Sequence, residues 1–308
     1  MTTIAVVVPS YQHARWIGEA VESALSQSRP PDEVVVVDDG STDGTLEVLA
    51  GFGSRIRVLR AARKGVGAVY NMGFEATSSD LVAFLESDDV LEPRYLEETE
   101  DFLEGNRVFG WVSTARLLID GEGRPTGEIS RRRYLENGCE FTFEGFLSGE
   151  LGASSTPVVR RIALKDVGLW SPDSYAADTD MALRFSLAHR MGYLDRPLYR
   201  YRRHGKNAST SLLESVRLNV PILERLLDPP HPALAGREAL VRRALAKMLG
   251  MQAALAMEED SAAGREDVLP LLKRAARLHP SPKHLRRLAL VSLFGPRAFG
   301  AWRRVRAR

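Results

Sequence analysis

Three carboxylates lie within four residues of one another, at Glu86, Asp88 and Asp89, directly after the apolar run of residues 81–85. Carboxylates at this density repel one another unless a cation or a set of hydrogen-bond donors neutralises them. Hard divalent ions such as Mg²⁺ and Mn²⁺ prefer oxygen ligands, and one or two carboxylates commonly hold them together with substrate phosphates. The segment is therefore either a cation site or an exposed acidic turn before the helix expected near Pro93.

Polar side chains follow two other apolar runs in the same half of the chain. Ser10 and Tyr11 come directly after the first run, and Asp38 and Asp39 come directly after the second. If the three runs are neighbouring parallel strands, their carboxyl ends meet at one edge of a sheet, where ligands bind in α/β proteins. The acidic segment would then be one part of a larger site, and we favour this interpretation over an isolated acidic turn.

The elements that would position these residues alternate regularly. Continuous β-branched runs predict strands buried on both faces, and apolar residues at helical spacing predict amphipathic helices between them. The expected order is strand 4–8, helix 14–26, strand 34–37, a helix ending near residue 50, strand 56–59, a helix ending near residue 76 and strand 81–85. This order predicts an α/β fold with a mostly parallel, Rossmann-like central sheet and helices on both faces.

Two common phosphate-binding patterns are absent. Gly65-Val66-Gly67 is only a fragment of a glycine-rich loop, and neither GxGxxG after the first strand nor GxxxxGK[ST] occurs. A Rossmann dinucleotide site and a P-loop are therefore not supported. We expect these glycines to serve the turn into the helix that follows.

From Val108 the alternation of strands and helices is less regular. Strands are expected at residues 111–119, 154–159 and 192–200. Asp178 and Asp180 lie in the first turn of a helix that should end near residue 191, where the helix dipole alone would favour carboxylates.

Two basic segments stand in this part of the chain. The segment at residues 199–207 follows the last expected strand and suits a substrate with anionic phosphates. For the cluster at residues 131–133, a solvated loop is the preferred interpretation.

Composition limits the class of protein. The chain of 308 residues is 44% hydrophobic and 27% charged, as in a globular protein, and its net charge of only +2 gives no sign of nucleic-acid binding. A single cysteine, Cys139, excludes an internal disulfide framework and fits a reducing compartment. No signal-peptide pattern and no apolar run near the roughly 18 residues of a membrane-spanning helix occur, so we expect a cytoplasmic protein.

The composition changes near residue 211. We expect one domain over residues 1–210 and an α-helical extension over residues 211–308, rich in alanine, leucine, arginine and glutamate. From Lys273 to the end there are 11 Lys or Arg and no Asp or Glu. Such a basic, amphipathic tail fits peripheral contact with the anionic inner face of a membrane. A homodimer contact and a helical lid on the domain are the alternatives.

Six ordered motifs within residues 3–207 resemble those of family 2 glycosyltransferases, which have the GT-A nucleotide-diphospho-sugar transferase fold. Residues 38–45 resemble the family's second-strand motif, which is highly specific, and Glu86 to Asp89 resemble its Asp-x-Asp region. The remaining matches are Val6 to Tyr11, Gly65 to Gly73, Ala177-Asp178 and Tyr201-Arg202-Arg203-His204. The expected helical extension lies outside this resemblance.

The resemblance implies a role for each matching residue. Asp178 would be the catalytic base, and Asp88, with Asp89 and Glu86, would bind Mn²⁺ or Mg²⁺. The nucleotide-sugar would contact a set of residues drawn from all the motifs: Pro9, Tyr11, Asp38, Asp39, Asn71, Ser87, Asp88, Arg202 and His204. A single base without a covalent intermediate implies inversion at the anomeric carbon.

Three positions depart from the family pattern. Glu86 replaces the first aspartate of the Asp-x-Asp region, Ala177 replaces the glutamate before the base, and Gln12 stands where asparagine is common. Glu86 can bind a metal ion, but its longer side chain changes its reach. Ala177 removes a carboxylate from the acceptor side.

The expected activity is metal-dependent transfer of a sugar from a nucleoside-diphosphate sugar to a hydroxyl of a glycan or lipid-linked acceptor. The resemblance also implies bacterial origin and a role in cell-surface polysaccharide or glycolipid assembly. A catalytically degenerate sugar-nucleotide-binding or scaffold protein is one alternative. A sugar-1-phosphate nucleotidyltransferase is another, but residues 9–13 lack the glycine-rich, basic loop that this activity would need.

Overall fold

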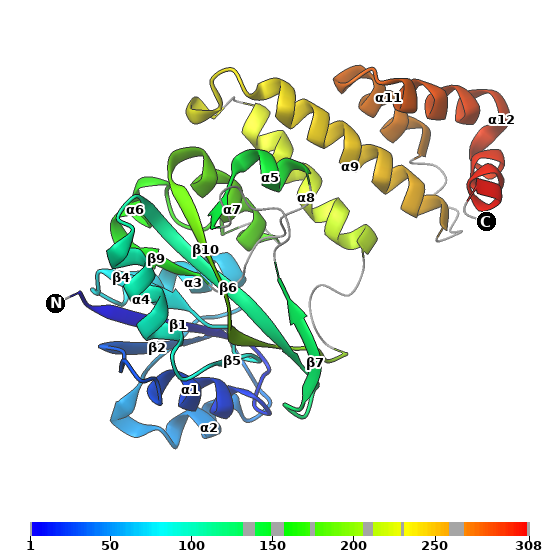
Figure 1. The fold of residues 1–308 in the computed structure, drawn as a ribbon. Helices are drawn as coiled ribbons and strands as arrows, with labels where there is room; N and C mark the ends of the chain where they lie inside the picture. Colours follow the sequence, from blue (N-terminus) through cyan, green and yellow to red (C-terminus); the bar gives the residue numbers. More distant parts are fainter. Residues whose placement is uncertain are drawn as a thin grey trace. The chain divides into compact units, whose positions relative to one another are not determined.

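The computed structural model describes residues 2–131, 139–148, 157–172, 176–205, 212–228, 231–258 and 268–306. The chain divides into two compact units, Met1–Asn207 and Ala208–Arg308 (Figure 1). The strands and helices of the first unit are β1 Ile4–Ser10, α1 Ile17–Leu25, β2 Glu33–Asp38, α2 Thr45–Ala50, β3 Arg57–Arg60, α3 Val66–Glu75, β4 Leu81–Phe84, β5 Val90–Leu91, α4 Tyr95–Gly105, β6 Phe109–Ile119, β7 Pro125–Ser130, β8 Glu140–Phe141, α5 Phe143–Ser148, β9 Val158–Arg160, α6 Arg161–Asp166, α7 Ala177–Ala188 and β10 Arg190–Arg202.

A central sheet organises this unit. Its strand order is β3-β2-β1-β4-β9-β6-β10-β5, with β7 paired to β6 and β8 paired to β10. Strands β3, β2, β1 and β4 are mutually parallel, as the alternation of strands and helices predicts. Strand β9 runs antiparallel to both β4 and β6, so the second half of the sheet is mixed.

Helices cover both faces of the parallel strands. On one face, Ile4, Val6 and Val8 of β1 pack in the same core cluster as buried residues of α1 and α4. On the other face, α3 packs against β1 and β2 through Val69 and Gly73. A side chain at Gly73 would place its Cβ 2.3 Å from Val7 Cγ1, so this position requires glycine for the helix to approach the strand.

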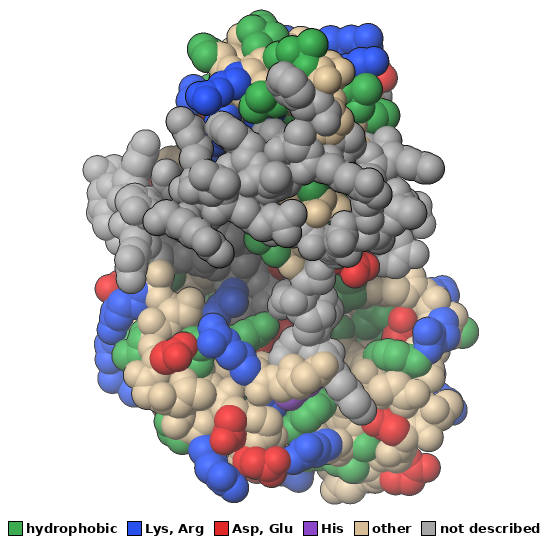
Figure 2. Space-filling view, turned by 90° about the vertical axis from the view of Figure 1, so that its right-hand side faces the viewer, with side chains coloured by type: hydrophobic (Ala, Val, Ile, Leu, Met, Phe, Trp, Pro, Cys, Tyr) green, Lys and Arg blue, Asp and Glu red, His purple; other side chains and the backbone are tan. Residues whose placement is uncertain are grey.

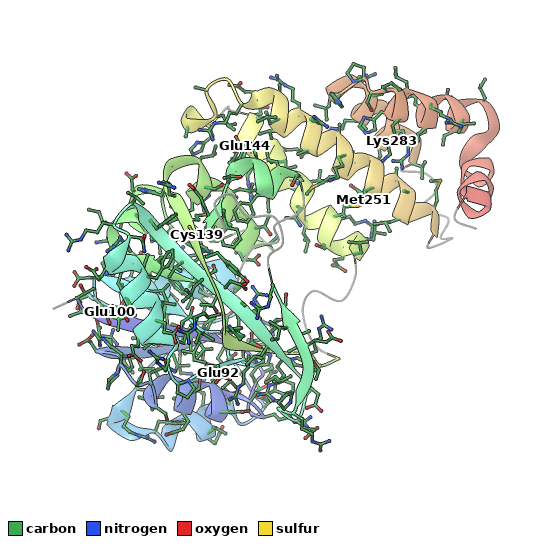
Figure 3. The ribbon with its side chains drawn as sticks, in the orientation of Figure 1. Glu92, Glu100, Cys139, Glu144, Met251 and Lys283 are labelled. Carbon is green, nitrogen blue, oxygen red and sulfur yellow. The ribbon has the colours of Figure 1, made fainter. Side chains whose placement is uncertain are left out.

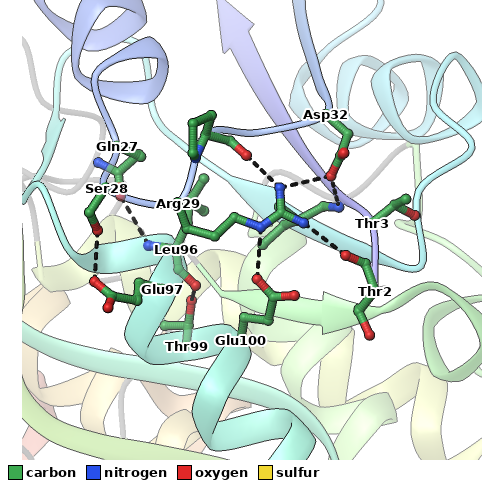
Figure 4. A network of polar contacts seen from close by, with 12 residues as sticks. Thr2, Thr3, Gln27, Ser28, Arg29, Asp32, Leu96, Glu97, Thr99 and Glu100 are labelled. Atoms are coloured by element: carbon green, nitrogen blue, oxygen red, sulfur yellow. Dashed lines mark hydrogen bonds and ion pairs between the residues drawn. The ribbon is translucent and has the colours of Figure 1, made fainter.

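A polar network fixes the loop that leads from α1 to β2 (Figure 4). The Arg29 guanidinium donates to Asp32 at 2.9 Å, to Glu100 of α4 at 2.8 Å and to the carbonyl of Thr2 at 2.8 Å. Asp32 also accepts from the backbone N–H of Ile4 at 2.8 Å. The network ties the amino end of β1 to the loop and to α4.

Ion pairs hold the far edge of the sheet. Glu92, labelled in Figure 3, directly follows β5. Its carboxylate pairs with Arg200 of β10, and its backbone N–H donates to the Leu198 carbonyl at 2.9 Å. Cys139, the residue before β8, is half-buried and carries a free thiol.

On the face shown in Figure 2, acidic and basic side chains are interspersed over the described surface, in keeping with the small net charge.

The second unit is helical. It contains α8 Leu212–Leu227, α9 Glu238–Glu258, α11 Val268–Leu278 and α12 Pro282–Arg306, with a kink in α12 at Gly295. Val268 and Leu272 of α11 are buried with Ala253 of α9 and Val291 of α12, so the apolar face of α11 lies in the core of the unit. No helix in the described part of the chain is long and apolar enough to cross a membrane.

Candidate functional site

The acidic segment forms a tight turn between β4 and β5, at the carboxyl edge of the parallel strands. The Leu85 N–H donates to the Val7 carbonyl at 3.0 Å, which extends the pairing of β4 with β1 by one residue. The Asp89 N–H then donates to the Glu86 carbonyl at 3.1 Å and closes the turn. The backbone therefore places the three carboxylates together, as the sequence predicts, but their side chains have different surroundings.

Asp88 faces a histidine from the C-terminal end of the first unit. Its Oδ2 atom lies 2.9 Å from Nε2 of His204, the second residue after β10. The His204 side chain is 7% exposed and that of Asp88 is 14% exposed. The indole of Trp16 stacks on the His204 ring, with centroids 4.1 Å apart. Two of the predicted site residues thus meet, although 116 positions separate them in the sequence.

Asp89 is buried below the turn. The Tyr199 hydroxyl and the Arg202 backbone N–H donate to its two oxygens, the latter at 2.7 Å. Burial and the nearby charge of Asp88 raise the pKa of Asp89 to about 8, although both hydrogen bonds act in the opposite direction. These contacts differ from the predicted role as a metal ligand. They join β10 to the acidic turn.

Glu86 points toward α3. The Tyr70 hydroxyl donates to its Oε1 atom, and Tyr70 itself stacks on Trp170. Burial raises the pKa of Glu86 to about 8, and the charges of Asp88, Asp89 and Asp178 add to this effect. The longer side chain at this position therefore binds a tyrosine of the protein rather than extending toward Asp88 and His204.

Arg202 is almost fully buried, at 1% exposed. Its guanidinium donates to the Asp88 carbonyl at 2.7 Å, to Glu19 of α1 at 2.6 Å and to the Asp120 carbonyl at 3.4 Å. The sequence predicts contact with the nucleotide-sugar. The structure instead places the guanidinium among protein acceptors from the acidic turn, α1 and the turn after β6, where it supports the site.

The second polar strand end lies at β2. Asp38 is fully buried, and its Oδ2 accepts from the N–H groups of Gly40 at 3.2 Å and Ser41 at 3.0 Å. Its other oxygen, Oδ1, finds no hydrogen-bond partner among the described residues, and neither does the buried hydroxyl of Ser10, which is paired with Asp38 in the sheet. Buried polar atoms without partners are costly, so they mark a place for an incoming donor.

Asp39 has a different environment from Asp38. Its two oxygens accept from the backbone N–H groups of Lys64 at 2.8 Å and Gly65 at 3.0 Å. It therefore holds the turn before α3 in place. Beside this turn, the Arg63 guanidinium lies over the ring of Tyr11 at 4.3 Å. Tyr11 is 37% exposed, so part of its ring remains accessible.

One loop connects the Asp38 end of the site to the Asp88 end. Gln12 donates its backbone N–H to Ser41 Oγ at 2.9 Å, and its side-chain amide exchanges hydrogen bonds with Thr42. The next residue, His13, places Nδ1 2.7 Å from Ser87 Oγ in the acidic turn. Residues 10–13 thus bridge the carboxyl ends of β2 and β4.

Asp178 and Asp180 lie in the first turn of α7, as predicted, with different roles. Asp180 is buried and accepts from Arg184 at 2.9 Å and from the Ser171 hydroxyl at 2.7 Å, so it stabilises the start of the helix. Asp178 is partly exposed and accepts from the adjacent Thr179 N–H at 2.8 Å. Burial raises the pKa of Asp178, whereas the charge of Arg116 opposes that shift.

Asn71 holds the loop that precedes α7. Its amide donates to the Trp170 carbonyl at 2.8 Å and accepts from the Trp170 N–H at 2.9 Å. The Asn71 side chain was predicted to contact the nucleotide-sugar, and in the structure both its oxygen and its nitrogen bind protein backbone. The Trp170 ring contacts Tyr70 and Phe84, and this packing links the loop to the acidic turn.

Three contributing residues were missed by sequence reasoning: His13, Trp16 and Tyr70. A histidine two residues after the tyrosine of the first-strand motif was a usable signal for His13. Trp16 and Tyr70 had no signal of that kind, because an aromatic residue at helical spacing is ordinarily part of a core. The predicted basic cluster at residues 131–133 lies outside the described residues except for Arg131, which pairs with Asp195.

Comparison with known proteins supports what the geometry indicates. Residues 5–149 match the model of Glycosyl transferase family 2. The chain therefore carries a glycosyl transferase family 2 region at residues 5–149. The chain is 33% identical over 131 residues to an uncharacterized glycosyltransferase from Nostoc sp., a match covering 41% of this chain and 40% of the relative. It is 28% identical over 220 residues to the chondroitin synthase of Pasteurella multocida, a match covering 70% of this chain and 22% of the synthase. The chain thus spans less than half the length of these two relatives.

Solved structures confirm the predicted GT-A fold. S. aureus TarS 1-349 in complex with UDP-GlcNAc superposes on the chain with a TM-score of 0.69 at 19% identity, covering 97% of this chain and 88% of that one. The mannosyltransferase PcManGT from Pyrobaculum calidifontis in complex with GDP-Man and Mn²⁺ gives a TM-score of 0.58 at 19% identity, covering 98% and 87%. The chain therefore has a mixed α/β GT-A-like fold with C-terminal helices.

Proposed function

We propose that this protein is a metal-dependent, inverting glycosyltransferase that moves a sugar from a nucleoside-diphosphate sugar to an acceptor hydroxyl. The observation that carries the proposal is the meeting of Asp88 and His204 beside the carboxyl edge of the parallel strands, with Asp88 Oδ2 2.9 Å from His204 Nε2. Glu86 stands in the same acidic turn and binds Tyr70 of α3; burial raises its pKa to about 8, and the charges of Asp88 and Asp178 add to this effect. These observations support a single site in which Asp88 would bind the cation and Asp178, from a distant part of the sequence, would act as the base.

The nucleotide base would bind at the carboxyl end of β2. Asp38 Oδ1 and the Ser10 hydroxyl are buried there without a partner among the described residues, so a base that donates an N–H group would satisfy them. The Tyr11 ring and the backbone at Pro9 would complete this end. The TarS and PcManGT structures, which hold UDP-GlcNAc and GDP-Man, support a sugar nucleotide as donor.

The diphosphate would bind at the other end of the loop of residues 10–13. Asp88 and His204 present an oxygen and a nitrogen that a divalent ion can bind, and Ser87 lies beside them. A bound Mn²⁺ or Mg²⁺ would stabilise the charge that develops on the leaving diphosphate. Arg202 keeps the acidic turn in place by binding the Asp88 carbonyl.

Asp178 would take the proton from the acceptor hydroxyl. Its pKa is raised by burial, which brings a carboxylate closer to the operating pH of a general base. As the hydroxyl oxygen forms a bond to the anomeric carbon, the bond from that carbon to the diphosphate breaks, and the proton goes to Asp178. A single displacement of this kind inverts the anomeric configuration.

The acceptor class is proposed by analogy. Relatives named chondroitin synthase and a Bacillus subtilis relative named putative glycosyltransferase EpsH support a glycan or lipid-linked acceptor in bacterial polysaccharide assembly. Peripheral contact of the basic tail with an anionic membrane also stays a proposal. In the described part of that tail, the exposed large apolar side chains are Leu285 and Leu293.

A binding panel tests the donor assignment. The melting temperature of the protein is measured with UDP-, GDP- and dTDP-sugars, each with Mn²⁺ and with Mg²⁺. One base class should raise the melting temperature, and Asp38→Asn, which replaces the unpartnered oxygen or its neighbour by an amide, should remove most of that rise. No shift with any donor would contradict the proposal. Binding without any turnover would favour a degenerate sugar-nucleotide-binding protein.

A further inference from the structure

We propose that His13 joins Asp88 and His204 as a ligand of the cation, in a site with two nitrogen donors and one oxygen that takes a transition-metal ion in preference to Mg²⁺. One ligand atom from each of the three residues lies within 4.8 Å of the other two. All three residues are partly buried. This inference deepens the proposed function by naming a further ligand and the class of ion. It rests on the proposed function for the role of the ion at the donor diphosphate.

The separation of the donor atoms suits a metal ion. Asp88 Oδ2 and His204 Nε2 are 2.9 Å apart. Two ligand atoms at about 2.1 Å from one ion and at right angles to each other lie about 3 Å apart. An ion could therefore bind both atoms with little movement of either side chain. The remaining ligand, His13, approaches from the loop after β1.

The His13 ring is held in place before any ion binds. Its Nδ1 atom lies 2.7 Å from Ser87 Oγ, and its ring packs edge-on against Trp16 with centroids 5.5 Å apart. The His13 carbonyl accepts from the N–H groups of Trp16 and Ile17, both at 2.9 Å, at the start of α1. Metal-binding histidines commonly have such a second partner, which fixes the ring orientation.

The backbone before His13 is strained in a way that directs the ring. Gln12 has a φ of 56°, in the left-handed region that residues other than glycine rarely adopt. Hydrogen bonds to Ser41 and Thr42 hold it there. Strain of this kind persists where the surrounding structure enforces it, often at a ligand site. Here its result is that His13 meets the acidic turn.

The neighbouring carboxylates do not compete for the same position. Glu86 binds the Tyr70 hydroxyl, and Asp89 binds the Tyr199 hydroxyl and the Arg202 N–H. The group of ligand atoms therefore contains one carboxylate and two imidazoles. Imidazole suits transition metals, whereas Mg²⁺ prefers oxygen ligands throughout its octahedron.

Mn²⁺ binding to the full-length protein without nucleotide tests the proposal. Bound Mn²⁺ is counted by electron paramagnetic resonance, and pulsed measurements detect the nitrogen nuclei that ligate it. We expect two imidazole nitrogens in the unmodified protein and one in His13→Ala. Loss of even an outer partner of a metal ligand costs about 10–100-fold in affinity, so His13→Ala should weaken Mn²⁺ binding at least about tenfold. Mg²⁺ should displace Mn²⁺ only at a concentration higher by at least an order of magnitude.

The matched control is His189→Ala, because His189 pairs with Asp166 away from the acidic turn. It should bind Mn²⁺ as the unmodified protein does. One nitrogen in the unmodified protein, equal affinity in His13→Ala, displacement by equal Mg²⁺ or no Mn²⁺ binding at all would each overturn the proposal. The unmodified protein supplies the nitrogen count even if His13→Ala does not fold. Donor turnover is measured separately: turnover without a His13 effect removes only this inference, and Mn²⁺ binding through His13 without turnover removes only the proposed function.

Discussion

The indole of Trp16 lies almost parallel to the imidazole of His204, with an interplanar angle of 22° and ring centroids 4.1 Å apart. The Trp16 Nε1–H donates to the Gly121 carbonyl at 3.0 Å, which fixes the orientation of the indole. His204 therefore reaches Asp88 with its ring plane set by Trp16, the residue directly before α1. Trp16 is a positioning residue in this arrangement.

Replacing Trp16 separates stacking from hydrogen bonding. An aromatic stack contributes about 0.5–1.5 kcal/mol, so Trp16→Leu should weaken Mn²⁺ or donor binding by roughly 2–12-fold. Trp16→Phe keeps a ring beside His204 but lacks the hydrogen bond to Gly121, and it should retain most of the affinity for Mn²⁺ or donor. Both variants are compared by calorimetric titration and by KM against kcat. Equal losses in the two variants would show that the hydrogen bond, not the stack, positions His204.

Substitution of Asp178 is predicted to affect the transfer rate, whereas substitution of Asp180 is predicted to affect the free energy of unfolding. Asp178→Asn removes the proposed base and should lower transfer at least about 100-fold while nucleotide affinity stays unchanged. Asp180→Asn weakens the contacts with Arg184 and Ser171, so it should lower the free energy of unfolding by about 1–3 kcal/mol. Rates, nucleotide affinity and melting temperatures are measured for both. Loss of nucleotide binding in Asp178→Asn would show that this carboxylate is not the base.

The Arg29 network predicts a specific acid sensitivity (Figure 4). Burial raises the pKa of Asp32, but the hydrogen bond from Ile4 and the Arg29 pair outweigh it and bring that pKa below 3.8. Between the folded-state pKa and the higher unfolded-state pKa of Asp32, the unfolded chain binds more protons than the folded one. The stabilisation by Asp32 is therefore complete above about pH 4 and is lost as the pH falls through the folded-state pKa.

Asp32→Asn tests this sign. Because Asp32 is partly exposed, the loss at pH 7 should be modest, about 0.5–1 kcal/mol. The difference in melting temperature between Asp32→Asn and the unmodified protein should shrink as the pH is lowered toward 3. A difference that is constant with pH, or that grows on acidification, would show that the Asp32 charge is not what stabilises the loop.

The close approach of α3 to β1 gives a packing test. Gly73→Ala would place a methyl group 2.3 Å from Val7 Cγ1 and should destabilise the protein by about 1–3 kcal/mol. At Gly105, the last residue of α4, no atom lies within 4 Å of an added Cβ, so Gly105→Ala should be neutral or slightly stabilising. Thermal unfolding compares the two. Equal stability of both variants would contradict the tight helix-to-strand contact.

Sequence patterns predicted the parallel half of the sheet well, because its strands are continuous apolar runs and its helices have a clear apolar face. They also predicted that Asp38, Asp88 and Asp178 come from strand ends and a helix start. The mixed half was less accessible. Strand β9 has three residues, and its antiparallel position between β4 and β6 depends on contacts between distant segments.

Side-chain direction was the part of the site that the pattern could not predict. Glu86, Asp88 and Asp89 are adjacent in sequence, but Tyr70, His204 and Tyr199 decide their roles, and these partners come from other elements. The same holds for Arg202 and Asn71, which match the motifs but bind protein groups. Motif matching identifies a residue type at a position, whereas the role depends on the partner.

Release of nucleoside diphosphate from a panel of UDP-, GDP- and dTDP-sugars is the most direct test of the proposed activity. The purified protein is assayed with Mn²⁺, with Mg²⁺ and with a chelator, and Asp178→Asn is the control. The proposed activity predicts release from donors of one base class, dependent on the divalent ion and lost in Asp178→Asn. Release that persists in the chelator and in Asp178→Asn, or no release from any donor with either ion, would contradict it.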